Sequence, residues 1–152
     1  MTSQIFNILV DSREQCPWLF TSIKPRPEII IQGLKTGDYS ISGHEESGIC
    51  VERKNKSDLF GSCGKGRNRL EREFQRMSLF DYSAIVIERT MGDCIKNPPE
   101  STKMKPKAVI NTMLSWSIRY GVHVYFVEDR ILSEKICFGL FKHFLKQQAE
   151  DI

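Results

Sequence analysis

The sequence predicts an α/β domain in which a mixed central sheet is flanked by helices. Three observations carry this prediction: short β-rich runs fill the first third of the chain, helical spacing of apolar residues begins after residue 57, and helices then alternate with strands. The length of 152 residues suits a single domain over 1–152. A hydrophobic content of 40% and a charged content of 27% are globular values. No run approaches the roughly 18 apolar residues of a membrane helix.

The first third of the chain is expected to form short strands separated by turns and prolines. The first run is rich in β-branched and aromatic residues and stops at a polar turn that begins with Asp11. A turn at Gly37 introduces the third strand, and the fourth strand ends in a charged cluster at 52–54. The expected strands are residues 5–10, 28–34, 39–41 and a run that begins at residue 49.

The remainder of the chain has the apolar period of helices. Ser57 fits the N-cap of a short helix, with Asp58 in its first turn. A longer helix follows, because Leu70, Phe74 and Met77 recur at helical spacing. Further along, the sequence predicts a buried strand at 84–87, a surface loop at 91–104, a helix at 106–120 that ends before Gly121, a strand at 122–127 and a last helix from residue 133.

Basic residues are concentrated between residues 53 and 76. Eight Lys and Arg face three acids in this segment, although the whole chain carries a net charge of only +3. Such a cluster is typical of a surface that follows a phosphate backbone. An ordinary solvated face has the same composition, so the charge alone leaves both interpretations open.

Several classes of protein are disfavoured by composition. The chain has five cysteines without a CxxC pair, and only three histidines, which argues against a structural zinc site. Idle thiols in a reducing compartment are the simpler interpretation. The first ten residues lack the basic region of a signal peptide, so we expect a cytoplasmic protein, or a nuclear one in a eukaryote.

Two acids and a lysine are expected where two consecutive strands meet at one edge of the sheet. Asp38 precedes the third strand and Glu52 lies in the fourth, so a hairpin brings them together. Lys54 is two residues beyond Glu52 and therefore on the same face of the strand. Carboxylates, waters and a phosphate are the ligands that Mg²⁺ prefers, so the pattern predicts metal-assisted phosphodiester hydrolysis. The same residues also fit an exposed, salt-bridged strand end.

A longer motif around these residues resembles the XPF-type nuclease family, the structure-specific DNA endonucleases named for xeroderma pigmentosum group F. Its central part is Gly37-Asp38 followed by Glu52-Arg53-Lys54 and then Asp58. The run 10–14 resembles the family's first-strand acidic motif. The resemblance covers residues 5–88 and implies the restriction-endonuclease-like fold of the PD-(D/E)XK nucleases. Further parts that agree are Ser57-Asp58-Leu59, Ser62, Gly66-Arg67 and the strand 85–88 that ends in an acid.

The resemblance implies roles for individual residues. Asp38 and Glu52 would bind the metal, and Asp11 would line the same site through water or a second ion. Lys54 would be the catalytic lysine, and Asp58 would lie near the metal or hold its neighbours in place. The residues implied to contact DNA are Arg13, Arg53, Lys65, Arg67, Arg69, Arg72 and Arg76, and those that support the site are Glu14 and Glu88.

Together these residues predict a Mg²⁺-dependent DNA endonuclease that cuts branched or flap DNA, with Mn²⁺ able to replace Mg²⁺. Neither the tandem helix-hairpin-helix module nor the helicase of many family members fits within 152 residues. The protein is therefore expected to act as a homodimer or with a partner, through the apolar surface of its last two helices. Two alternatives stay open. One is a junction resolvase or restriction-like nuclease of another PD-(D/E)XK branch, and the other is an inactive scaffold that binds DNA for a catalytic partner.

Overall fold

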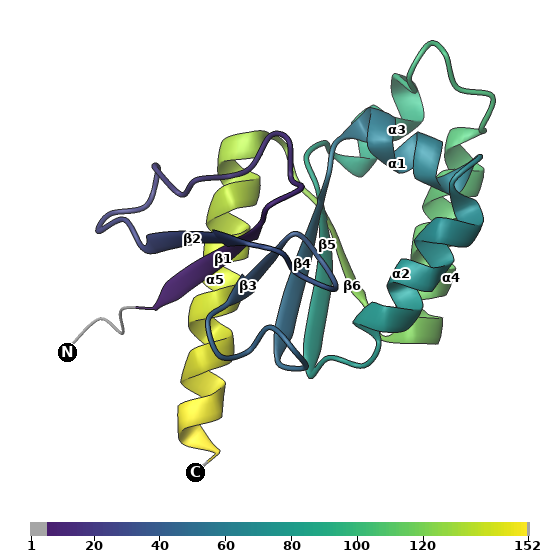
Figure 1. Cartoon of the computed structure of the whole chain (residues 1–152). Coiled ribbons are helices and arrows are strands. Elements are labelled where there is room, and N and C mark those ends of the chain that lie inside the picture. The colour runs from purple at the N-terminus through teal and green to yellow at the C-terminus, as the bar shows by residue number, and fades with distance from the viewer. Residues whose placement is uncertain (1–5, 152) are drawn as a thin grey trace.

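The computed structural model describes residues 6–151, which form one mixed sheet with helices on both faces (Figure 1). Within these residues the sheet has six strands in the order β2-β1-β3-β4-β5-β6. The first two strands are parallel, β3 is antiparallel to both β1 and β4, and β4, β5 and β6 are parallel. The predicted α/β fold with a mixed sheet is confirmed. The strands are β1 (Asn7–Asp11), β2 (Glu28–Gln32), β3 (Tyr39–Ile41), β4 (Ile49–Lys54), β5 (Tyr82–Ile87) and β6 (His123–Phe126).

Two hydrophobic cores lie on opposite faces of the sheet. Ile85 and Ile87 of β5 belong to the core beneath α1, α2, α3 and α4, whereas Val86 belongs to the core beneath α5 (Figure 1). This division follows from the alternation of side chains along a strand. Of the helices within residues 6–151, none is long and apolar enough to cross a membrane. The helices are α1 (Lys56–Cys63), α2 (Arg67–Met77), α3 (Met91–Lys96), α4 (Pro106–Tyr120) and α5 (Arg130–Glu150).

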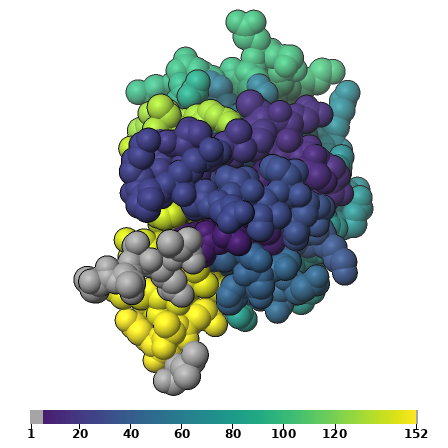
Figure 2. Space-filling model, turned by 60° about the vertical axis from the view of Figure 1, so that its left-hand side comes forward, coloured from purple at the N-terminus to yellow at the C-terminus, as the bar shows by residue number. Residues whose placement is uncertain are grey.

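The segment between β1 and β2 is held against α5. Trp18 stacks on Tyr39 with ring centroids 4.8 Å apart, and both rings are buried. The buried carboxylate of Glu134 accepts the N–H of Phe20 at 2.8 Å and the hydroxyl of Ser22 at 2.5 Å. Figure 2 shows the N-terminal segments in purple and blue beside the yellow end of α5, which extends away from the sheet. These contacts fix the position of the segment beside the sheet.

Two helices begin earlier than their predicted starts. Asn55, and not Ser57, caps α1, because its side chain accepts the N–H of Asp58 at 2.8 Å. Asp129 caps α5 by accepting the N–H of Leu132, so the last helix begins three residues before residue 133. Asn and Asp cap helices as well as Ser does, and sequence spacing alone did not select between neighbouring candidates.

The segment 91–104 was predicted as a loop, which is wrong for its first six residues. They form α3, capped by the Thr90 side chain and anchored by buried Cys94. By contrast, α4 spans the predicted residues and ends at Gly121, whose φ of 66° is left-handed. The strands differ from their predicted bounds by one or two residues at their ends. Residue 5, predicted to open the first strand, lies outside the described residues.

Candidate active site

Asp38 and Glu52 meet at one end of the paired strands β3 and β4. Asp38 lies directly before β3, and Glu52 is the fourth residue of β4. The Asp38 N–H donates to the carbonyl of Val51 at 2.9 Å, and the Asp38 carbonyl accepts the N–H of Asp11 at 2.8 Å. These backbone bonds bring acids from three adjacent strands to one end of the sheet. The convergence expected from the hairpin is thus present in the structure.

The side chains of Asp38 and Glu52 are partly buried next to each other, which disfavours the charged forms of their carboxylates. Burial raises the pKa of Asp38 to about 6, although hydrogen bonds with Glu52 and from the Arg53 N–H (2.8 Å) partly oppose this shift. Burial also raises the pKa of Glu52 well above its usual range, and the charges of Asp38 and Glu73 raise it further. Two partly buried acids that share a hydrogen bond carry more negative charge than Lys54 offsets, which favours the binding of a divalent cation.

Glu73 is a third acid at this place and was not predicted from the sequence. It comes from α2, accepts the N–H of Gly37 at 3.1 Å and pairs with Arg76. Burial acts to raise the pKa of Glu73, but hydrogen bonds from Glu52, Arg76 and Gly37 lower it overall. The signal in the sequence was its position four residues after Arg69 and three before Arg76, which puts all three on one helical face. From the sequence, Glu73 was only one of the three acids counted in the basic segment 53–76.

Lys54 extends from the end of β4 into the same cleft. Its Nζ donates to the hydroxyl of Ser62 on α1 at 3.0 Å. This bond holds the ammonium group on the side of the strand that also carries Glu52. Asp58 lines the cleft from the first turn of α1, where its side chain is exposed. Lys54 is thus fixed by a neighbouring helix, whereas Asp58 lies at the solvent side.

Asp11 ends β1 and anchors the turn that follows it. Its Oδ1 accepts the N–H of Leu34 at 2.9 Å, and its Oδ2 accepts the Nε–H of Arg13 at 3.1 Å. Arg13 donates a further bond to the Leu34 carbonyl at 2.6 Å, yet its side chain is 73% exposed. The buried Asp11 carboxylate therefore directs an exposed guanidinium toward the cleft.

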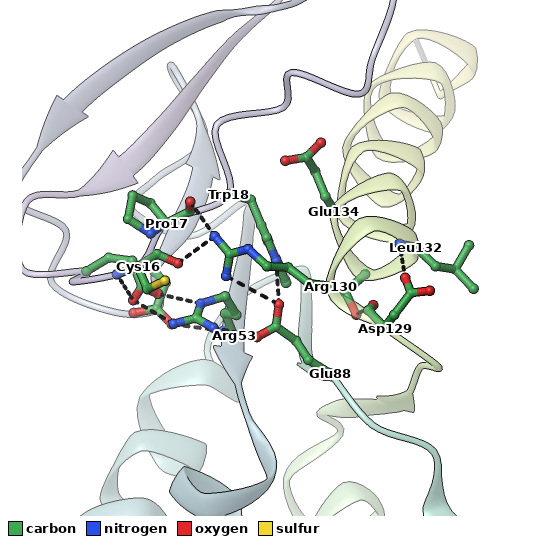
Figure 3. Close-up of polar contacts among 12 residues, drawn as sticks. Cys16, Pro17, Trp18, Arg53, Glu88, Asp129, Arg130, Leu132 and Glu134 are labelled. Carbon is green, nitrogen blue, oxygen red and sulfur yellow. Dashed lines mark hydrogen bonds and ion pairs between the residues drawn. The ribbon is translucent and has the colours of Figure 1, made fainter.

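Arg53 lies differently from its predicted place on a DNA-binding surface. Its side chain is only 8% exposed and forms ion pairs with Glu14 at 3.2 Å and with Glu88 at 2.5 Å. Burial acts to lower the pKa of Arg53, but these two carboxylates raise it overall. Figure 3 shows Arg53 beside Glu88, which also accepts the indole N–H of Trp18 at 2.9 Å. With its guanidinium enclosed in this way, Arg53 joins β4 to β5 and does not face a phosphate, so its assignment as a DNA contact is corrected.

A cleft of about 800 Å³ covers this edge of the sheet. Among the described residues that line it, six are acids and six are basic, so the protein itself supplies no net charge there. Lys35, not predicted as a site residue, is one of the basic side chains. The acids are Asp11, Glu14, Asp38, Glu52, Asp58 and Glu73, and the basic residues are Arg13, Lys35, Arg53, Lys54, Arg69 and Arg76.

The structure separates the predicted basic residues of 65–76 into two groups. Arg69 and Arg76 line the cleft, whereas Lys65 and Arg72 are exposed outside it. Arg67 turns toward α4, where its guanidinium lies 4.7 Å from the centre of the Trp116 ring. It also donates to a threonine hydroxyl of α4 at 2.9 Å. Arg67 thus joins α2 to α4 but is exposed, so its contact with DNA stays a prediction.

The donor set at the cleft fits a hard divalent cation. Among residues 6–151, three or more His, Cys, Asp or Glu side chains are nowhere gathered closely enough to form a complete metal cage. Mg²⁺ does not need one, because it is commonly held by one or two carboxylates while waters and a substrate phosphate complete its octahedron. Asp38 and Glu52 could supply those carboxylates, and burial, together with neighbouring acids, raises the pKa of each.

The chain matches the ERCC4 domain over residues 10–138, which is most of its length. No curated protein is similar enough to count as a match. Among solved structures, XPF from Aeropyrum pernix is similar with a TM-score of 0.67 and 19% identity, over 93% of this chain and 61% of that chain. The same protein in complex with DNA is similar with a TM-score of 0.65 and 19% identity, over 96% and 66% respectively. The chain thus spans less than two thirds of those relatives. By its sequence match and its fold, this protein belongs to the ERCC4 domain family and has the fold of an XPF-type nuclease domain.

Proposed function

We propose that this protein is a metal-dependent DNA endonuclease that cuts branched or flap DNA. The observation that carries the proposal is the partly buried pair Asp38 and Glu52: burial raises the pKa values of both, and Lys54 of the same signature lies in their cleft. A structural ion pair would have its counter-charge within the protein, as Arg53 does with Glu14 and Glu88. A buried acid pair without one costs stability, which is typical of a functional site.

In the proposed mechanism, the carboxylates of Asp38 and Glu52 hold the cation at the end of the sheet. When bound there, Mg²⁺ or Mn²⁺ would supply Lewis-acid chemistry: a more acidic bound water and a polarised phosphoryl oxygen. Lys54, oriented by Ser62, stabilises the negative charge that develops on the phosphate. Asp11 supports the site by directing Arg13, and Asp58 lines the cleft at its solvent side.

Glu73 is proposed to position Glu52 and the turn that carries Asp38. Its contacts reach both elements, because it accepts the Gly37 N–H and shares a hydrogen bond with Glu52. Outer contacts of this kind orient the ligands of metal sites. Arg69 and Arg76, on either side of Glu73 along α2, are proposed to bind the flanking phosphates together with Lys35.

DNA is the proposed substrate because the similar XPF from Aeropyrum pernix has been solved in complex with DNA. A deciding experiment is cleavage of end-labelled flap, fork, four-way-junction and linear duplex DNA in Mg²⁺, in Mn²⁺ and in EDTA. We expect metal-dependent nicks near the branch that are lost in Asp38→Asn, while DNA binding persists. Asp81→Asn, an exposed acid before β5, is the matched control and should cut normally.

The alternatives give different products in the same assay. Symmetric paired cuts restricted to four-way junctions would indicate a junction resolvase, and cuts at one sequence in linear duplex a restriction-like enzyme. Binding without cleavage in either metal would overturn the proposed activity and leave a DNA-binding scaffold. Each outcome is read directly from the positions of the labelled products.

We further propose that the active form is a dimer. The two C-terminal helices cover opposite faces of the sheet, so they do not form one continuous apolar face (Figure 1). Exposed apolar residues nevertheless occur on both: Ile118 of α4 is 85% exposed and Ile131 of α5 is 63% exposed. A shared contact would have to pass around the edge strand β6. The molar mass of wild type and Ile118→Asp, measured by light scattering, tests it: the variant should be a monomer.

A further inference from the structure

A second cleft lies beside the first at the same end of the sheet. It has a volume of about 340 Å³ and is lined by Asn55, Lys56, Ser57, Glu88, Arg89 and Arg130. Asn55 and Ser57 also line the catalytic cleft, so the two hollows are neighbours separated by the first turn of α1. Both lie at the carboxyl ends of the parallel strands β4 and β5, where open α/β sheets bind their ligands.

The charge of the second cleft differs from that of the first. Three basic side chains line it, and they contact two carboxylates between them. Asp93 is shared by Lys56 at 2.8 Å and Arg89 at 3.9 Å. Glu88 is 3.6 Å from Arg130 and is already paired with Arg53. The lining cations therefore exceed the carboxylates that they contact, and an anion would find positive charge here without a metal ion.

The cations differ in how firmly they are held. Arg130 reaches from α5 and donates to the carbonyls of Cys16 and Pro17 at 2.8 and 2.6 Å, as Figure 3 shows. Arg89 is 52% exposed, and its one hydrogen bond within the described residues is a 3.3 Å contact to the Glu88 carbonyl. Most of the donors of Arg89 thus face solvent. A guanidinium with free, forked donors suits the oxygens of a phosphate.

The spacing between the clefts suits the repeat of a nucleic-acid strand. Lys54 lines the first cleft, Lys56 lines the second, and Asn55 between them has extended backbone angles. Two extended residues span about 7 Å, and each nucleotide of a DNA strand advances about 3.4 Å along the helix axis. A strand with its scissile phosphate near Lys54 would therefore reach the second cleft within one or two nucleotides.

The geometry points to a phosphate-binding subsite, formed by Arg89 and Lys56, for the DNA strand that continues from the cleaved bond. This inference rests on the proposed function, because it names where the substrate of that site passes next. The subsite binds the backbone and reads no base sequence. It acts without metal, whereas the catalytic cleft, with equal numbers of acids and bases, depends on the metal for its attraction to phosphate.

The test is a double variant, Lys56→Gln with Arg89→Gln, compared with Lys142→Gln. Lys142 is exposed on α5, twelve residues and about 18 Å of helix beyond Arg130. The dissociation constant for fork DNA is measured in EDTA at several salt concentrations. We expect it to rise about tenfold in the double variant, as loss of a charge-assisted contact does. The slope of log K against log salt should fall by about 0.7 to 0.9 for each phosphate released.

A second measurement locates the contact on the DNA. Uncharged methylphosphonate links are placed one or two nucleotides to either side of the cut in the fork substrate. At one of these positions the wild type should bind more weakly, and the double variant should be insensitive to the same change. Equal affinities and equal salt slopes for the two proteins would overturn the subsite. If the wild type binds this way but cleaves nothing in Mg²⁺, the proposed activity fails while the subsite stands.

Discussion

Two groups of acids lie side by side at one end of the sheet and have opposite electrostatic environments. Glu14 and Glu88 enclose the guanidinium of Arg53, and all three side chains are less than 10% exposed. Glu52 shares hydrogen bonds with Asp38 and with Glu73, and the pKa values of Asp38 and Glu52 are raised, first by burial. The first group is enclosed around its counter-charge, whereas Asp38 and Glu52 have only the neighbouring Lys54 and no ion pair of their own within the described residues.

Within one short motif, this difference separates a residue that stabilises the fold from the residues that are proposed to act in catalysis. In Glu52-Arg53-Lys54, successive side chains of β4 point to opposite faces, so Arg53 pairs with Glu14 and Glu88 at the border of the cleft, while Glu52 contacts Asp38 and Lys54 contacts Ser62. A buried ion pair fixes the local geometry, because breaking it leaves a charge uncompensated. An acid pair without an ion-pair partner can bind a cation. Single substitutions in the two groups test this difference.

The largest effect is expected from Glu52→Gln. The change keeps the size of the side chain but removes the charge that would bind the metal, so cleavage should fall by about a hundredfold to a thousandfold or more, the range for losing one electrostatic stabiliser. Single-turnover cleavage of fork DNA in Mg²⁺ measures it. The comparison variant is Glu14→Gln, which should lower the melting temperature more than the rate. Equal losses of rate in the two variants would contradict the division between the groups.

Arg53→Met tests the enclosed group. It leaves Glu14 and Glu88 buried without their cation, and we expect the free energy of unfolding to fall by about 3–5 kcal/mol, as when one partner of a buried ion pair is removed. Urea denaturation followed by circular dichroism gives this value. Arg72→Met, at an exposed position of α2, controls for loss of an arginine and should change stability by less than about 0.5 kcal/mol.

Glu73→Gln tests whether Glu73 contributes to metal binding. If Glu73 positions Glu52, its loss should weaken metal binding by about tenfold to a hundredfold, which is typical of residues behind metal ligands. Titration of Mn²⁺ by calorimetry, without DNA, measures this affinity. Glu71→Gln, which lies on the same helix and contacts Tyr120, is the matched control. An unchanged affinity in Glu73→Gln would remove Glu73 from the site.

The smallest effect concerns stability without metal. The pKa of Asp38 rises from 3.8 to about 6 on folding, so the folded state holds this proton more tightly than the unfolded state. Stability is therefore lost as pH rises from about 4 to 6, and Asp38→Asn should avoid a loss on the order of 3 kcal/mol at pH 7. Thermal unfolding in EDTA at pH 4 and pH 7 measures the difference. Below pH 4 the variant should have no advantage, and Mg²⁺ at pH 7 should stabilise only the wild type.

Much of the site was predictable because its residues lie close together in the chain. Asp38, Glu52 and Lys54 are separated by one hairpin, and the two-residue period of a strand settles which side chains share a face. The bounds of α4 followed from Pro106, the apolar spacing and Gly121. Glu73 was missed because its relation to Glu52 depends on how α2 packs over the sheet. The basic residues beside it, Arg69 and Arg76, drew the prediction toward a uniform positive face.

The sequence by itself determined the α/β class, the order of most elements and the acids that meet at the end of β3 and β4. Local propensity, hydrophobic period and one short motif contain that information. Only the tertiary structure decided which charges are enclosed and which are open. Arg53, Arg67 and Arg69 are the same residue type in the same basic segment, yet one is buried between carboxylates, one stacks on Trp116 and one lines the cleft. Their roles depend on long-range packing, because the energy of a charge is set by the groups that surround it in the fold.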